Sequence, residues 1–352
     1  MLRKTQWAST PTKKPTIKDV AQKAGVSIAT VSFVLNKRPG QAISKQVSRR
    51  VLEAAVELNY HPNASAAGLA RKRTQNITIV FYKNDRLPAN PFYSWVVHGV
   101  VRAAMDAEHN VLFSYVTSTY RGPADLPKVV REANTSGAIF IQHLHPRMVE
   151  DIQRLGIPVV GIDHFPTMRT INSLQIDNHH GALLATQHLL DLGHRSLVFL
   201  RAGRQRPSIA ERAAGFRDAL RAGGLNSAGR LVDANELGFE ASHARARDLL
   251  AQRDRPTAIF CANDDVASGV LRAAWELGVQ VPRELSVVGF DDIAMSRRLL
   301  PPLTTVGVDK QRLGSQALER LLELIAGNGG EVRHETVPVR LVVRDSTALA
   351  PR

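Results

Sequence analysis

The sequence predicts an all-α helix-turn-helix domain at the N-terminus, followed by a large α/β body of parallel sheets with helices on both faces. Three observations lead to this prediction. A helix–turn–helix pattern lies near the N-terminus, most of the excess positive charge lies in the same region, and short apolar runs alternate with helical stretches through the rest of the 352 residues. The combination is typical of a nucleic-acid-binding head joined to a larger body.

The segment 16–36, TIKDVAQKAGVSIATVSFVLN, has the pattern of two short helices joined by a tight turn. Thr16 can cap the first helix, with Asp19 near the positive end of that helix. Gly25 supplies the turn because it tolerates left-handed dihedral angles, and Ser27 can cap the second helix. The apolar residues at helical spacing are Val20, Ala21, Ala24, Val31, Val34 and Leu35. The pattern predicts a DNA-reading unit whose second helix enters the major groove; the alternative is an ordinary helical hairpin.

The distribution of charge favours the DNA-reading interpretation. The chain carries 46 Lys+Arg against 32 Asp+Glu, a formal net charge of +14. The first 75 residues hold 14 basic and three acidic residues, so +11 of this charge lies in about a fifth of the chain. A compact basic head on a nearly neutral body is typical of nucleic-acid-binding proteins, because cations that contact phosphates release condensed counterions.

The head continues with a third predicted helix and an ordered set of short motifs. Ser44 can begin this helix, and the apolar residues of its core face are Val47, Val51, Leu52, Ala55 and Leu58. The motifs DVA, AGVS, TVS, LNYxPN and AxxLA follow one another between residues 19 and 70. In this order they resemble the lactose/galactose repressor family of bacterial transcription regulators, from Thr16 to about Thr347. The resemblance implies a ligand-responsive repressor that binds a pseudo-palindromic operator as a homodimer or a higher oligomer.

The resemblance also implies which residues contact operator DNA. The segment after YxPN folds on DNA into a hinge helix, and Leu69 is wedged into the minor groove with Ala66 on the same face. Base reading falls on Ile28, Ala29 and Phe33. Phe33 stands where an arginine is frequent in the family and cannot make the arginine's bond to guanine, so the operator sequence stays open. The expected DNA-contacting residues are Thr16, Ser27, Ile28, Ala29, Thr30, Ser32, Phe33, Asn36, Asn63, Ala66 and Leu69.

The body alternates candidate strands with stretches that have apolar residues three and four apart. The candidate strands are Ile77–Tyr82, Val111–Val116, Gly137–Ile141, Ile157–Ile162, Ser196–Leu200, Thr257–Ala262 and Leu285–Phe290. Candidate helices include Ala182–Leu192, Arg212–Ala222 and Val266–Leu277. This alternation predicts parallel sheets, and about 270 residues are too many for one such sheet, so two lobes are expected.

The family resemblance implies that the body is a two-lobed, periplasmic-binding-protein-like domain for effector binding and dimerisation. We expect the chain to cross between the lobes near Leu174, Val308 and Thr336, and the strand Val337–Val343 to return to the second lobe. The predicted division is residues 1–15 for a disordered basic tail, 16–61 for the helix-turn-helix domain, 62–75 for the hinge, 76–174 and 308–335 for lobe one, and 175–307 and 336–347 for lobe two.

Polar residues follow several predicted strands, at the edge where ligands of parallel sheets bind. By resemblance, the effector-binding residues are Phe92, Tyr93, Asp163, Arg212, Asn263 and Asp291. The aromatic pair offers an apolar face and the others bond polar groups of the ligand. From the residues alone each acid is equally a helix N-cap, and this interpretation is kept for Asp264, Asp265 and Asp292. Arg212 is expected to start a helix.

The expected effector is a small molecule, a sugar or a sugar derivative. A purine-type corepressed regulator and an activator are the alternatives that the family leaves open. Arg201, Arg204 and Arg206 lie in one loop beside the expected site and would suit an anionic effector such as a sugar acid, although such a run is more often a solvated loop.

Enzymatic and secreted functions are disfavoured. The sequence has no GxxxxGK[ST], GxGxxG or GxSxG pattern, and the metal-like spacing of His143 and His145 has no cysteine beside it, so we expect no enzyme activity, cofactor or metal ion. Cys261, the single cysteine, is expected to be a buried side chain in a reducing compartment. No signal peptide or membrane-spanning run is found, which predicts a cytoplasmic protein without membrane contact and argues against a secreted solute-binding receptor.

Overall fold

The computed structural model describes residues 14–35, 43–61, 74–82, 90–117, 119–142, 145–163, 170–203, 206–225, 229–234 and 238–351. The chain divides into two compact units, residues 1–75 and 76–352, which we call the head and the body. Among the helices described, none has both the length and the apolar character that a bilayer span requires.

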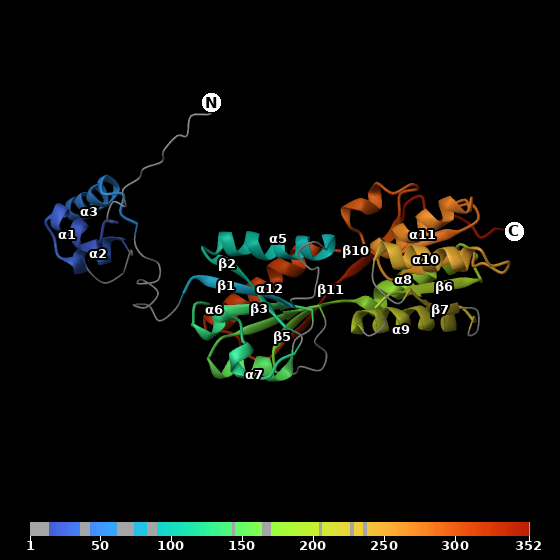
Figure 1. The fold of residues 1–352 in the computed structure, drawn as a ribbon, viewed down its shortest axis with the longest axis horizontal. Helices are drawn as coiled ribbons and strands as arrows, with labels where there is room; N and C mark the ends of the chain where they lie inside the picture. Colours follow the sequence, from blue (N-terminus) through green and yellow to red (C-terminus); the bar gives the residue numbers. More distant parts are fainter. Residues whose placement is uncertain are drawn as a thin grey trace, which may run out of the picture. The chain divides into compact units, whose positions relative to one another are not determined.

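The described part of the head consists of α1 (Ile17–Ala24), α2 (Ile28–Leu35) and α3 (Lys45–Glu57) (Figure 1). The Asp19 carboxylate accepts hydrogen bonds from the Thr16 amide at 2.7 Å and from its hydroxyl at 2.8 Å, which fixes the start of α1. Gly25 ends α1 with a φ of 63°, a conformation that glycine adopts without strain. The buried core of the head is formed by Val20, Ala21, Ala24, Val31, Val51, Ala54 and Ala55.

The first sheet of the body, sheet A, has all its described strands parallel, in the order β11-β5-β4-β3-β1-β2. The strands are β1 (Asn76–Tyr82), β2 (Asn110–Val116), β3 (Gly137–Ile141), β4 (Val159–Ile162), β5 (Asn172–Ile176) and β11 (His334–Val337). The helices around it are α5 (Pro91–Asp106), η2 (Pro123–Asp125), α6 (Lys128–Arg131), α7 (Pro146–Arg154) and α12 (Lys310–Ile325). Because β1 and β3 are buried on both faces, their sequences are nearly continuous apolar runs.

The second sheet, sheet B, has the order β12-β10-β9-β8-β6-β7, with β12 antiparallel to β10 and the other described ladders parallel. The strands are β6 (Leu197–Arg201), β7 (Gly229–Asp233), β8 (Ala258–Cys261), β9 (Ser286–Asp291), β10 (Thr304–Val308) and β12 (Val339–Val342). The helices around it are α8 (Asn178–Asp191), α9 (Pro207–Ala222), α10 (Phe239–Leu250), α11 (Asp264–Glu276) and η3 (Ala294–Arg297). We call the elements of sheet A lobe one and those of sheet B lobe two.

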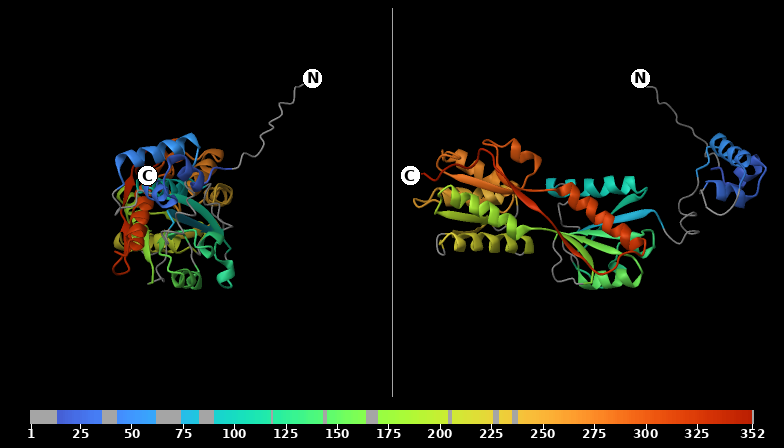
Figure 2. Two further views of the ribbon diagram at one scale, coloured as in Figure 1. Left: turned by 90° about the vertical axis from the view of Figure 1, so that its left-hand side faces the viewer. Right: turned by 180° about the vertical axis from the view of Figure 1, so that it is seen from behind.

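The chain passes between the two sheets after β5, after β10 and after β11, because each of these strands is followed by an element of the other lobe (Figure 2). The strands that the sequence predicts are all present, with ends shifted by at most two residues. Four further strands, β5, β7, β10 and β11, were not among the candidates. The strand expected at Val337–Val343 is β12, which is shorter.

The helices α5 and α12 pack closely together in lobe one, and two glycines make this possible. A Cβ atom on Gly99 would lie 2.1 Å from the Gln311 carbonyl oxygen, and one on Gly314 would lie 2.0 Å from the Val96 carbonyl oxygen. Any larger residue at either position would push the helices apart. The first turn of α12 is therefore held firmly against α5.

The C-terminal segment 344–350 is bound to lobe two by hydrogen bonds. The Ser346 hydroxyl donates to the Val287 carbonyl at 2.6 Å, and the Ala348 amide donates to the Ser286 hydroxyl at 3.1 Å. The fully buried His194 lies beneath this segment, with Nε2 2.9 Å from the Ser286 hydroxyl. The segment therefore completes the packing of sheet B.

Candidate functional site

The start of α2 is the part of the described head with the character of a DNA-contacting surface. Ser27, Ile28 and Ala29 are exposed there, and Thr16 is exposed at the start of α1. The Ser27 hydroxyl accepts a hydrogen bond from the Thr30 amide at 3.1 Å and lies 2.9 Å from the Thr30 hydroxyl. A helix N-terminus with exposed side chains can approach phosphates and base edges closely.

The remaining predicted DNA contacts divide into two groups. Ser32 and Phe33 are half-buried on α2. Asn36, Asn63, Ala66 and Leu69 lie outside the described residues, as do residues 1–13 of the expected tail and residues 62–73 of the expected hinge. The DNA contacts of both groups stay predictions.

In lobe one, Tyr93, Gln142 and Asp163 form a hydrogen-bonded relay at the carboxyl ends of the strands. The Tyr93 hydroxyl donates to Oδ2 of Asp163, and the Gln142 amide donates to the Tyr93 hydroxyl at 2.7 Å. Burial raises the pKa of Tyr93 well above its usual value, so the phenol keeps the proton that it donates. Phe92 packs edge-on against Tyr93, with ring centroids 4.9 Å apart. The relay fixes the orientation of the Asp163 carboxylate.

One oxygen of Asp163 is left for another partner. Asp163 is only 8% exposed, and its Oδ1 atom is buried with no hydrogen-bond partner among the described residues. A buried carboxylate oxygen without a donor is unfavourable, and native structures rarely leave one unexplained. A ligand hydroxyl or amine would supply the missing donor.

In lobe two, the Arg212 guanidinium is enclosed by protein groups. Its Nε donates to Asn178 Oδ1 at 2.9 Å, its Nη1 donates to the Ala262 carbonyl, and its Cζ lies 3.5 Å from the centroid of the Phe290 ring. Its Nη2 lies 3.7 Å from Oδ1 of Asp291. Arg212 is 6% exposed and fixed from several directions, so its guanidinium is held in one orientation.

The position of Arg212 corrects the expectation that it starts a helix. The helix α9 begins at Pro207, and Arg212 lies in its second turn. Proline suits the first position of a helix because its fixed φ is helical and its missing N–H has no partner there in any case. The proline therefore marks the true start.

Carboxyl groups from the two lobes lie near enough to influence one another. Burial raises the pKa of Asp291 from 3.8 to about 7; Arg212 and Lys310 oppose this shift, and the charge of Asp163 adds to it. Burial also raises the pKa of Glu211, and Asp163 again adds to the shift. The charge of Asp163 in lobe one therefore acts on the pKa of Asp291 and of Glu211 in lobe two. We call Tyr93, Gln142, Asp163, Asn178, Glu211, Arg212 and Asp291 the polar cluster.

The backbone at several of these positions is strained. Gln142, Asp163 and Asp291 have φ values of 70°, 58° and 109°, and the neighbouring Asp292 has 49°. Non-glycine residues adopt such conformations rarely, and they are concentrated at binding sites, where the surrounding structure holds them. The strain lies at the ends of β3, β4 and β9, where the sequence placed the effector site.

The polar residues at the start of α11 make contacts within the protein. Asn263 caps α11, accepting a hydrogen bond from the Val266 amide at 3.0 Å, and no described contact tests its predicted effector role. Asp264 is not a cap: it is fully buried and accepts hydrogen bonds from the Ile293 amide at 2.8 Å and the Ser296 hydroxyl at 2.6 Å, which tie η3 to the sheet.

Asp292 is not a cap either. Its carboxylate accepts a hydrogen bond from Arg344 at 2.6 Å and lies 3.7 Å from Arg297. Sequence could not reveal this pairing, because Arg344 lies more than 50 residues away in the chain. The ion pair attaches the start of the C-terminal segment to the end of β9.

One arginine of the predicted loop, Arg201, is already paired within the protein. Arg201 forms a two-bond ion pair with Asp233, with both donor–acceptor distances 2.8 Å. Arg206 precedes α9 at its N-cap position, and Arg204 lies outside the described residues. Both bonds of Arg201 to Asp233 would have to be given up before it could bind a ligand with the same nitrogens.

Four members or neighbours of the polar cluster were not predicted from the sequence: Gln142, Asn178, Glu211 and Lys310. Glu211 directly precedes the predicted Arg212 in the chain. Gln142 directly follows the predicted strand Gly137–Ile141, so the rule that picked Asp163 would have found it. Asn178 and Lys310 follow β5 and β10, two strands that were not predicted. No group of three or more His, Cys, Asp or Glu residues within the described ranges is arranged to hold a metal ion.

Comparison with known families matches both parts of the chain. Residues 16–63 match the model of bacterial regulatory proteins of the lacI family, and residues 186–347 match a periplasmic binding protein-like domain. The first match covers α1, α2 and α3, and the second covers most of lobe two with α12 and β11 of lobe one.

Individual relatives match over nearly the whole chain. The HTH-type transcriptional repressor PurR of Photobacterium profundum is 31% identical over 333 residues, 94% of this chain and 98% of the relative. The structure of the lac repressor dimer bound to operator and the anti-inducer ONPF has 29% identity and a TM-score of 0.83, covering 96% of this chain and all of that one. A complex of the transcriptional regulator CelR with cellobiose has 25% identity and a TM-score of 0.68, covering 94% and 99%.

Proposed function

The chain belongs to the lacI family of bacterial regulatory proteins, and on this premise we propose that it is a transcriptional repressor that binds a pseudo-palindromic operator as a dimer. A small molecule in the body switches it. The protein acts on DNA in the cytoplasm and is not an enzyme. The observation that carries the proposal is a helix-turn-helix head in the same chain as a two-lobed body with a buried polar cluster.

The effector would bind at the polar cluster, where residues of both lobes come together. A ligand that bonds Asp163 of lobe one and Arg212 or Asp291 of lobe two at once stabilises one arrangement of the lobes over others. That arrangement sets the spacing of the two hinge segments in the dimer. With the hinges apart, the two heads cannot contact both half-sites together, so effector binding and operator binding are coupled.

The chemistry of the cluster favours an effector rich in hydroxyl groups, a sugar or a sugar derivative. The Arg212 guanidinium already bonds Asn178 and the Ala262 carbonyl, whereas Oδ1 of Asp163 needs a donor. Glu211 and Asp291 add further acceptors. Hydroxyl groups donate to such oxygens, whereas an ionised phosphate or carboxylate has no hydrogen to donate to Oδ1 of Asp163. Cellobiose in the CelR complex is of this class.

A purine-type corepressed regulator is the second candidate. The observation that favours it is the match to PurR repressors, which extends over 94% of this chain. In this version a ligand strengthens operator binding and does not release it. Phe92 and Tyr93, buried at the edge of the cluster, would supply the stacking surface for a flat ring.

Two measurements test the proposal. Operator sequences are selected from random DNA with the full-length protein, and gel-shift titrations on the selected site are repeated at several salt concentrations. We expect one dimer per pseudo-palindrome and a steep fall of affinity with salt, because the head contacts many phosphates. Full-affinity binding of one monomer to a single half-site would contradict the dimer model.

The effector is then sought by thermal-shift measurements with sugars, sugar acids, phosphosugars and purines, since a ligand that binds only the folded state raises its stability by mass action. A compound that protects the body and also changes the gel shift is the effector. Release of DNA indicates an induced repressor, and tighter binding indicates the corepressed version. Protection by phosphosugars alone would argue against the hydroxyl-donor assignment.

A further inference from the structure

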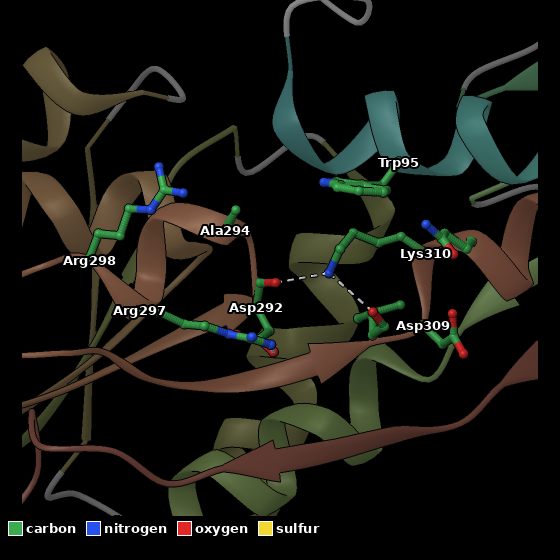
Figure 3. Close-up of a pocket in the computed structure, with 9 residues that line it drawn as sticks. Trp95, Asp292, Ala294, Arg297, Arg298, Asp309 and Lys310 are labelled. Atoms are coloured by element: carbon green, nitrogen blue, oxygen red, sulfur yellow. Dashed lines mark hydrogen bonds and ion pairs between the residues drawn. The ribbon is translucent and has the colours of Figure 1, made fainter.

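Lys310 connects the two lobes at the point where the chain leaves β10. It lies in the first turn of α12, a helix that packs against α5, β3, β4 and β5 of lobe one. Its ammonium reaches into lobe two, where it donates to the carbonyl of Asp291, to that of Asp292 at 3.1 Å and to that of Val308 at 3.1 Å. Figure 3 shows the ammonium between Asp292 and the end of β10.

The carbonyls that Lys310 holds belong to the strained end of β9. Asp291 and Asp292 both have left-handed backbones, which persist only where the surrounding structure enforces them. A cation that donates to both carbonyls is such a constraint. Asp292 is fixed by its side chain as well, through Arg344, whereas the described ion pair of the Asp291 side chain is the longer 3.7 Å approach to Arg212. Lys310 thus adds a side-chain constraint, beside the pairing of Asp291 with Gly307 in the β9–β10 ladder, to the backbone that orients the Asp291 carboxylate.

Lys310 also lies close to the lobe-one side of the polar cluster. Its ammonium is 5.9 Å from the centroid of the Phe92 ring, within the range of a cation–π contact. Together with Trp95 of α5 it lines an open pocket of about 430 Å³ (Figure 3). One side chain therefore contacts an effector-site residue of each lobe and the crossing strand between them.

We propose that Lys310 is the positioning residue that couples the state of the polar cluster to the crossing between the lobes. Its ammonium fixes the backbone of Asp291, and a change at Asp291 is passed to the first turn of α12 and so to lobe one. This inference rests on the proposed function, which supplies the effector. The contacts of Lys310 exist without an effector, so they can be tested in the absence of both operator and effector.

The test compares amide hydrogen exchange in the ligand-free full-length protein and in Lys310→Ala. We expect the amides of residues 291–294 to exchange at least about tenfold faster in the variant, because a hydrogen bond to a charged group contributes roughly that factor. Arg312→Ala is the matched control, since it removes one exposed positive charge from the same turn of α12 and should leave this segment unchanged.

Chemical rescue separates the ammonium from the rest of the side chain. The pocket beside Lys310 is open, so ethylammonium can reach the vacated carbonyls of Lys310→Ala. We expect ethylammonium chloride to restore slow exchange at residues 291–294, and sodium chloride at the same ionic strength not to do so. Both results together support the proposal.

Two outcomes would overturn it. Unchanged exchange at residues 291–294 in Lys310→Ala would show that other contacts hold the end of β9. Faster exchange spread evenly over the body, without rescue by ethylammonium, would show that Lys310 only stabilises the fold. Either outcome would leave the proposed function untouched, because operator binding by the wild-type dimer is measured separately. Failure of the wild-type protein to bind an operator would contradict the proposed function, and the exchange result for Lys310→Ala would still be valid.

Discussion

Replacement of Asp291 by asparagine should make the protein more stable at alkaline pH while removing its response to effector. Asp291 is 8% exposed, and burial raises the pKa of its carboxyl from 3.8 to about 7. Folding therefore opposes ionisation of this group, although Arg212 lies 3.7 Å away. The asparagine side chain is not charged at any pH and keeps nearly the same shape, so the Asp291→Asn variant avoids the cost of a buried charge.

The magnitude follows from linkage between proton binding and folding. The pKa of Asp291 is raised in the folded state, so folding favours the protonated carboxyl group. Its contribution to stability is complete below pH 3.8 and is lost as the pH rises toward about 7. Each pH unit in this window removes about 1.4 kcal/mol from the wild-type protein. The variant should exceed the wild type by about 4 kcal/mol in free energy of unfolding at pH 8 and by about 2 kcal/mol at pH 5.

The assay is urea denaturation of both proteins at a series of pH values from 5 to 8. Asp292→Asn is the matched control, because the same substitution one residue further breaks the 2.6 Å ion pair with Arg344 and should destabilise. A variant at Asp291 that is less stable than the wild type at pH 8 would refute the reasoning. A difference that does not change between pH 5 and pH 8 would also refute it, since the burial of the charge could not then be its origin.

Further predictions concern three other positions. Arg212→Ala should abolish the effect of effector on operator binding and lower the free energy of unfolding by about 3 kcal/mol, because it leaves buried partners unpaired; unchanged effector affinity by calorimetry would remove Arg212 from the site. Leu69→Ala should weaken operator binding by about 2 kcal/mol and reduce DNA bending, measured by gel shift, if the residue is the minor-groove wedge that its sequence position predicts; equal bending in both proteins would show that it is not. Burial lowers the pKa of His194 below 6.5, so its contribution to stability is complete above pH 6.5 and is lost as the pH falls below that value. The melting temperature of the wild type should therefore fall more between pH 7 and pH 5 than that of His194→Asn, and parallel curves would contradict this.

The strands that sequence predicts well are those whose side chains are apolar on both faces. Gly137–Ile141 and Leu285–Phe290 are of this kind, and β3 and β9 occupy nearly the same residues. The strands β7 and β11 lie at sheet edges and have polar sequences. In β10 two threonines are fully buried, because Thr305 donates to Asp264 and Thr304 bonds the distant Ser346. Partners so far away in the chain leave no local pattern.

The same limit applies to the polar cluster. Asp163 and Asp291 could be picked from the sequence because each directly follows a predictable strand. Asn178 and Lys310 follow β5 and β10, two strands that were not recognised from an apolar pattern. Their places at the polar cluster therefore follow only from the order of the strands in the two sheets. The neighbouring Asp291 and Asp292 lie beside different arginines, Arg212 at 3.7 Å and Arg344 at 2.6 Å, which come from separate parts of the chain.

The position of α12 in the chain has a consequence for biosynthesis. A ribosome has made all three described helices of the head once α3 ends at Glu57, and these helices have a hydrophobic core of their own. Sheet A, however, receives its covering helix α12 and its edge strand β11 only when residues 310–337 have been made, although its first strand begins at residue 76. Neither lobe can therefore finish folding until nearly the whole chain has emerged. A polypeptide released before residue 310 would carry a folded DNA-reading head on an incomplete body, without the Lys310 contact between the lobes and without a means of answering to any effector.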